Sequence, residues 1–196
     1  MPKALSEHEK EQITEAIYKT VLELIKEKDL KSVTVDDVMM SLSMAKGSFY
    51  KYYTSKEVCL YEVIKRSEND IFDRLEATLT SSSPSKDVLI KALHEIFLND
   101  DSIALYITPK DAEWLYRKLP PEYAERECKK GKDYFERTIL AMGINPAKLD
   151  FGVLAHLMDS LVYTASKKDN ISQKKTAMEL IVNTIADYLM GGIEND

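Results

Sequence analysis

The stretch from residue 32 to residue 56, SVTVDDVMMSLSMAKGSFYKYYTSK, constrains the fold of this chain more than any other part. Thr34 and Asp37 have the spacing of a capping pair at the start of a helix. Apolar residues then recur at helical spacing over residues 35–42. After a short turn, a second helix is predicted over residues 45–52. Two short helices joined in this way form a helix-turn-helix.

The second short helix is expected to present a basic, hydroxyl-rich surface. Residues 38–56 contain three lysines and no acid, although the whole chain has a formal net charge of -6. With Phe49 facing inward, the helix exposes two ammonium and two hydroxyl groups, on Lys46, Ser48, Tyr50 and Lys51. Such groups are suited to phosphate oxygens. Gly47 is costly within a helix, and its missing side chain would let the backbone approach DNA closely.

In these residues the sequence resembles the TetR family of bacterial transcriptional regulators. The resemblance covers roughly residues 13–64 and rests on Thr-Val-Asp-Asp-Val, on Ala-Lys-Gly-Ser-Phe-Tyr-Lys-Tyr-Tyr and on the following Ser-Lys-Glu. It implies that Thr34 reaches a phosphate and that Lys56 holds the DNA backbone at the start of the next helix. It also implies that four residues face the operator: Lys46, Ser48, Tyr50 and Lys51.

Two residues depart from the pattern of that family. Ser43 stands where the turn usually has glycine, and Ala45 stands where the second helix usually has a Ser or Thr cap. Loss of such a cap costs up to about 1 kcal/mol of local stability. The turn is therefore expected to be less tightly held than usual.

Charge divides the chain into two parts. Residues 1–56 carry nine Lys and Arg against nine Asp and Glu, whereas residues 57–196 carry eighteen against twenty-four. A neutral domain with a basic tip can bind DNA while an acidic body is repelled by it. Taken with the resemblance to the TetR family, this division predicts a helix-turn-helix DNA-binding domain over residues 1–56 and a helical effector-binding and dimerisation domain over residues 57–196.

Capping residues and apolar periodicity predict helices along the rest of the chain. No strand alternation is present. The expected fold is all-α, with a three-helix DNA-binding domain joined to a helical ligand-binding and dimerisation domain, about nine helices in all. Apart from the two short helices, the predicted helices begin at Ser6, Ser55, Ser85, Thr108, Pro121, Pro146 and Ser172.

The last two predicted helices carry more apolar surface than one core requires. Residues 151–166 contain a single charge, Asp159. Such helices are expected to pair with the same helices of a second copy in a four-helix bundle. The residues predicted at this homodimer interface are Leu157, Leu161, Thr164, Leu180, Ile181, Ile185 and Tyr188.

The middle third of the chain is rich in aromatic residues, and two interpretations remain open. The aromatic side chains either pack a core or line a cavity for a small, apolar or aromatic effector. The resemblance favours an effector pocket between the central helices. Its candidate residues are His94, Phe97, Tyr106, Glu113, Trp114, Tyr116, Phe135 and Met158.

No residue pattern indicates catalysis or a cofactor. The histidines are widely separated and lack metal-ligand spacing, and His156 is expected to be a core residue. Cys59 and Cys128 form no CxxC pair. Phosphate-binding loops and nucleophile motifs are absent from the sequence. With no apolar run of transmembrane length and no signal peptide at the start, the predicted location is the cytoplasm.

The sequence thus predicts a homodimeric regulator that binds double-stranded operator DNA and carries no catalytic residue, metal or cofactor. Its expected role is that of a repressor released by a small effector. Two alternatives stay open. One is a helical interaction module that has lost DNA binding, and the other is a small helical enzyme that uses the central cavity.

Overall fold

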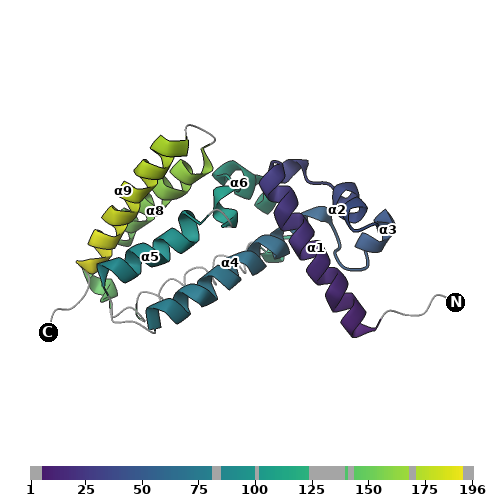
Figure 1. Ribbon diagram of the computed structural model, residues 1–196, viewed down its shortest axis with the longest axis horizontal. Coiled ribbons are helices and arrows are strands. Elements are labelled where there is room, and N and C mark those ends of the chain that lie inside the picture. The colour runs from purple at the N-terminus through teal and green to yellow at the C-terminus, as the bar shows by residue number, and fades with distance from the viewer. Residues whose placement is uncertain are drawn as a thin grey trace. The chain divides into compact units, whose positions relative to one another are not determined.

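The chain is built from helices, as predicted. A computed structural model describes residues 6–80, 85–99, 102–123, 140, 144–167 and 171–191. Within these ranges it contains helices and turns and no β-strand (Figure 1). The chain divides into two compact units, Met1–Ser67 and Glu68–Asp196.

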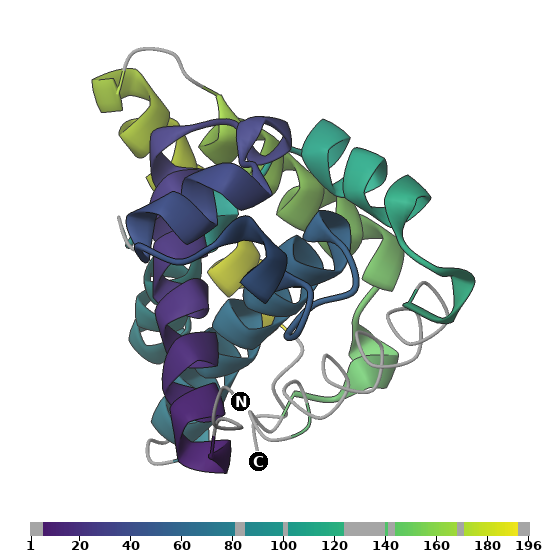
Figure 2. The same cartoon turned by 90° about the vertical axis from the view of Figure 1, so that its right-hand side faces the viewer.

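The N-terminal unit contains the helix-turn-helix. It consists of α1 (Glu7–Glu27), a 3-10 turn (Leu30–Ser32), α2 (Val35–Ser41), α3 (Lys46–Phe49) and the first part of α4 (Lys56–Thr80). Helix α2 packs against both α1 and α3 (Figure 2). The core of this unit is apolar and fully buried, and it includes Ile17, Val21, Ile25, Leu30, Val38, Met39, Phe49, Leu60 and Val63.

Side-chain caps fix where the N-terminal helices begin. Ser6 and Glu9 form a capping box, in which the Ser6 Oγ accepts from the Glu9 amide at 3.2 Å. Thr34 and Asp37 form the predicted box at the start of α2. Each box satisfies amides that the first helical turn would otherwise leave without partners. The predicted starts of these two helices are therefore confirmed.

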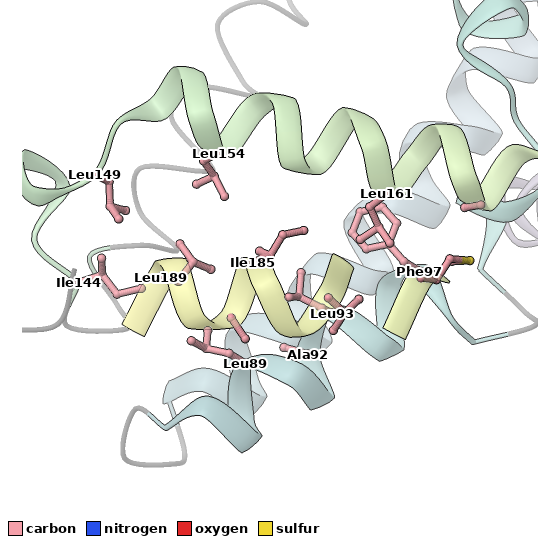
Figure 3. Close-up of a cluster of buried hydrophobic side chains, with 14 residues drawn as sticks. Leu89, Ala92, Leu93, Phe97, Ile144, Leu149, Leu154, Leu161, Ile185 and Leu189 are labelled. Atoms are coloured by element: carbon pink, nitrogen blue, oxygen red, sulfur yellow. The ribbon is translucent and has the colours of Figure 1, made fainter. Parts of the chain in front are cut away.

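The C-terminal unit has its core where three helices meet. Figure 3 shows Leu154 and Leu161 directed toward Ile185 and Leu189, with Leu89 on the opposite side. These residues belong to α8, α9 and α5 respectively. The elements of this unit that follow α4 are α5 (Lys86–Phe97), a 3-10 turn (Ile103–Leu105), α6 (Pro109–Lys118), a 3-10 turn (Pro146–Lys148), α8 (Phe151–Ser166) and α9 (Ile171–Met190).

Helix α8 begins later than the sequence pattern predicts. Pro146 starts only a 3-10 turn, and the α-helix begins at Phe151. The reason is Asp150, whose Oδ1 accepts from the amide of Gly152 at 2.8 Å and so caps the helix. The Tyr188 hydroxyl fixes this cap from α9, because it accepts from the Asp150 amide at 2.8 Å and donates to the Asp150 carbonyl at 3.1 Å.

Two other predicted helix starts in this unit are confirmed. Ser85 caps α5, and Thr108 caps α6 with Pro109 in the first position. The helix predicted over residues 121–142 lies almost wholly outside the described residues. None of the helices in the described ranges has the length and apolarity needed to cross a lipid bilayer.

Candidate DNA-binding site

The turn between α2 and α3 contains the chain's departures from the family pattern. The backbone angle φ of Ser43 is 54°, which lies in the left-handed region where glycine is favoured. A non-glycine residue there costs roughly 1–2 kcal/mol. Backbone bonds hold the turn, from the Ser43 amide to the Met40 carbonyl and from the Met44 amide to the Met39 carbonyl. Ala45 supplies no side-chain cap to α3.

Helix α3 is shorter than predicted. The α-helix ends at Phe49, whereas the sequence pattern extends it to residue 52. After Phe49 the amides of Lys51 and Tyr52 donate to carbonyls three residues back, at 3.2 Å and 2.9 Å. Such bonds tighten the backbone into turns rather than continuing the helix. Tyr50 therefore lies at the end of α3 instead of within it.

The side chains of α3 separate into one core residue and an open face. Phe49 is 1% exposed and stacks edge-on against Tyr50, with 5.5 Å between the ring centroids. Tyr50 itself is exposed. Lys46, Gly47 and Lys51 are also exposed, and Ser48 is half-buried. A Cβ added to Gly47 would meet no atom within 4 Å, so the subunit fold does not require glycine there.

The three lysines of this segment have different surroundings. The ammonium of Lys46 lies 2.7 Å from the Asp36 carboxylate, which raises the pKa of Lys46. Lys56 donates to the Lys31 carbonyl at 3.1 Å. The ammonium of Lys51 has no hydrogen bond or ion pair within the described part of the chain. Lys46 is thus held by an acid, and Lys51 is not.

The hydroxyl of Thr34 is engaged within its own helix cap. Its Oγ1 accepts from the Asp37 amide at 3.1 Å and donates to the Asp37 carboxylate at 2.8 Å. Lys28 lies 2.9 Å from the other oxygen of the same carboxylate. Hydrogen bonds from Lys28, and then from Thr34, lower the pKa of Asp37 to about 2. A phosphate bound by Thr34 would have to compete with Asp37 for its hydroxyl hydrogen.

We expect the N-terminal unit to lose stability as the pH falls from about 4 to about 2. The unfolded chain takes up the Asp37 proton near the ordinary pKa of 3.8, whereas the folded chain takes it up near 2. Stabilisation present above 3.8 is therefore lost as the pH falls through the folded pKa. Thermal unfolding of wild type and Asp37→Asn, followed by circular dichroism, should show a gap in midpoint temperature that narrows over this range. A gap that stays constant would contradict the expectation.

The residues predicted to line an effector pocket have different environments. Phe97 lies in the core between α5, α8 and α9, with Met158 packed against that core. Glu113 and Tyr116 are on the exposed side of α6. Glu113 pairs there with Arg117, so its charge is already compensated at the surface rather than directed to a pocket. Phe135 lies outside the described residues.

The remaining pocket candidates are half-buried. They are His94 in α5, Tyr106 after the 3-10 turn at residues 103–105, and Trp114 in α6. His94 has a buried Nε2 that lacks a hydrogen-bond partner within the described part of the chain. A buried nitrogen without a partner is costly, which makes His94 the one candidate with an unmet polar requirement among the described residues.

The residues predicted at a dimer interface do not all reach the surface. Leu161 and Ile185 are 0% exposed in the core of their own subunit. They have no surface left for a second chain, so an interface cannot include them. Leu180 is 66% exposed. The other four are partly exposed: Leu157, Thr164, Ile181 and Tyr188.

Helix α8 exposes apolar residues that the sequence pattern did not single out. Phe151, Val153 and Tyr163 are all more than two-fifths exposed. His156, predicted to be a core residue, is exposed on the same helix. The scarcity of charge along α8 indicated that the helix has surplus apolar surface. It did not indicate which of its apolar residues face outward.

Cys59 is a packed core residue. It is 2% exposed, and its burial raises the pKa of the thiol to about 12. A thiol with so high a pKa is rarely ionised and reacts slowly. Within the described ranges, no group of three His, Cys, Asp or Glu side chains is arranged to hold a metal ion.

Comparison with known proteins relates the N-terminal residues to one family. The family described as bacterial regulatory proteins, tetR family, matches residues 17–63. An uncharacterized HTH-type transcriptional regulator of Bacillus subtilis (strain 168), YxbF, is 28% identical over 107 residues. That match covers 48% of this chain and 28% of YxbF, so the chain spans well under half of the relative's length.

Two solved structures share the fold over most of the chain. The fatty acid degradation regulator FadR from Bacillus halodurans has a TM-score of 0.57 at 14% identity, covering 93% of this chain and 97% of that one. A transcriptional regulator of the TerR/AcrR family from Aquifex aeolicus VF5 has a TM-score of 0.56 at 19% identity, covering 88% and 98%. At these identities the likeness concerns the fold alone.

Proposed function

We propose that this chain, which belongs to the tetR family of bacterial regulatory proteins, is a homodimeric repressor that leaves its operator when a small effector binds. The observation that carries the proposal is the exposed face of the helix-turn-helix. Lysines and hydroxyl groups lie there together in an otherwise acidic protein. Its setting is the cytoplasm, where the operator DNA is found.

In this proposal α3 enters the major groove of the operator. Lys46, Ser48, Tyr50 and Lys51 face the DNA, and the bare backbone at Gly47 allows close approach. Lys56 binds a phosphate from the start of α4, where the Lys31 carbonyl already orients its ammonium. A two-fold dimer requires half-sites spaced by about one helical turn or a multiple of it.

The proposed dimer uses the outer faces of α8 and α9. Leu180 is exposed near the middle of α9, and Phe151, Val153 and Tyr163 are exposed on α8. Several hydroxyls on these helices donate to carbonyls of their own helix, such as Thr184 Oγ1 to Leu180 at 2.9 Å. Covering these hydroxyls would not leave their donors without a partner. A second copy supplies matching apolar helices.

The effector is proposed to bind in the C-terminal unit and to be largely apolar or aromatic. The Nε2 of His94 supports this assignment, since it lacks a partner among the described residues and a bound molecule would supply the hydrogen bond. The effector would favour a dimer whose two helix-turn-helix units have the wrong spacing for the operator. It can shift that equilibrium only by the difference between its affinities for the two states.

Titration against DNA tests the proposal directly. Fluorescence anisotropy should show that the protein binds a duplex from upstream of its own gene more tightly than an unrelated duplex of equal length. The comparison is made at several salt concentrations, because the phosphate contribution depends strongly on salt. Equal affinity for both duplexes would reject the repressor and favour an interaction module without sequence-specific binding.

We expect Lys56→Ala to weaken binding to every duplex with little change in sequence preference. Loss of one phosphate contact lowers the salt slope of log K by about one unit. Lys91→Ala is the matched control, because Lys91 is an exposed lysine of α5 in the other unit. If Lys56→Ala and Lys91→Ala have the same slope as wild type, Lys56 does not bind a phosphate.

A further inference from the structure

Asp36 and Lys46 form an ion pair that joins α2 to α3. The Asp36 Oδ2 lies 2.7 Å from the Lys46 Nζ, and both side chains are more than half exposed. An ion pair of such exposure adds little to stability. The cap of α2 is supplied by Thr34 and Asp37 instead. The fold of α2 therefore does not depend on Asp36, and the main effect of the pair falls on what Lys46 can bind.

The carboxylate lies on an open face of the helix-turn-helix. Met40, one turn further along α2 from Asp36, is 74% exposed, so this side of the helix is open within the N-terminal unit. Lys46 lies at the start of α3, on the face proposed to meet DNA. A negative charge at this place repels phosphates. Asp36 thus opposes the attraction of DNA phosphates to the neighbouring lysines.

Lys51 has different surroundings from Lys46. The Lys51 ammonium has no acidic partner in the described ranges. It can therefore neutralise a phosphate beside any base sequence. While Lys46 is paired with Asp36, its positive charge is largely neutralised for phosphates, but its ammonium keeps N–H donors for other acceptors.

We propose that Asp36 is a specificity-determining residue that acts by positioning Lys46. On unrelated DNA, where binding depends almost wholly on phosphates, Asp36 withholds the Lys46 charge and adds repulsion. On the operator, an ammonium held at a fixed place can donate to guanine O6 or N7 in the major groove. Asp36 therefore weakens non-specific binding more than operator binding. This inference rests on the proposed function.

The test is the affinity of Asp36→Asn for the operator duplex and for an unrelated duplex, each measured by anisotropy over a salt series. The variant should bind unrelated DNA about three- to tenfold more tightly, with a salt slope steeper by about one unit. Operator affinity should change less, so the ratio of the two affinities falls. Asn keeps the shape of Asp, and Asp36→Ser provides a second variant that suits a helix start.

Two controls separate this role from a change in net charge. Asp73→Asn removes one exposed acid from α4 in the C-terminal unit and should leave the affinity ratio unchanged. With Lys46→Ala already present, Asp36→Asn should lower the ratio no further, because the residue it positions is gone. Circular dichroism of each variant measures whether the fold is retained.

The outcomes distinguish this inference from the proposed function. If wild type prefers the operator but Asp36→Asn leaves both affinities and slopes unchanged, only the role of Asp36 is wrong. Equal tightening on both duplexes would also overturn it, because Asp36 would then act through charge alone. If wild type fails to prefer the operator, the proposed function fails as well.

Discussion

Replacing Phe49 by alanine should abolish operator binding by unfolding the helix-turn-helix. Phe49 is 1% exposed and is the one core side chain that α3 supplies. Its ring packs near Tyr53, with 5.7 Å between centroids. Truncating a buried Phe to Ala costs about 3–5 kcal/mol. Helix α3 has four residues, too few to persist without this contact.

Tyr50→Ala is the matched control for Phe49→Ala. Tyr50 is the adjacent aromatic residue, but it is exposed, so its loss should cost only about 1 kcal/mol through the edge-on contact with Phe49. Hydrogen exchange of the α2 and α3 amides measures both effects. Protection should disappear in Phe49→Ala and persist in Tyr50→Ala, although both bind DNA poorly. Retained protection in Phe49→Ala would show that α3 is held by other contacts.

The local signals in the sequence predicted most helix starts because capping is a short-range interaction. Thr34 and Asp37 are three residues apart, and each satisfies the backbone of the other. The same holds for Ser6 and for Thr108. The helix start predicted at Pro146 was wrong for a related reason. Proline suits the first helical position, but Asp150 is the stronger cap, and the α-helix starts after it.

The orientation of α8 and α9 could not be predicted from their sequences. Both helices are apolar on more than one side, so periodicity marks two faces without telling which one faces the subunit core. Leu161 and Ile185 proved to be core residues, whereas Phe151 and Tyr163 are exposed. That choice depends on packing among α5, α8 and α9, which brings together residues far apart in the sequence.

The pairing of Lys46 with Asp36 also could not be predicted from the sequence, because it depends on how two helices are arranged in space. The two residues are ten positions apart on different helices, and only the angle of the turn brings them together. Residues 38–56 contain no Asp or Glu, so the sequence predicted a surface free of acidic groups. In space, an acid from α2 lies on that surface.

Leu180→Glu should convert the proposed dimer into a monomer and weaken operator binding by about 100-fold or more. Leu180 is 66% exposed on α9, so a carboxylate is harmless in the isolated subunit. In the dimer the two symmetry-related carboxylates would be buried near each other without partners, which is strongly unfavourable. Operator affinity falls because two linked half-site contacts bind about 10²–10⁴-fold more tightly than one.

Leu140→Glu controls for the effect of the charge. Leu140 is 60% exposed and lies outside α8 and α9, so the same substitution should leave the protein dimeric and its operator affinity unchanged. Analytical ultracentrifugation gives the oligomeric state, and anisotropy gives the affinity. Phe151 and Tyr163 belong to the same proposed face, so Tyr163→Glu should repeat the result from α8. If Leu180→Glu remains dimeric, the interface lies elsewhere, because no well-packed apolar interface tolerates two buried carboxylates at its centre.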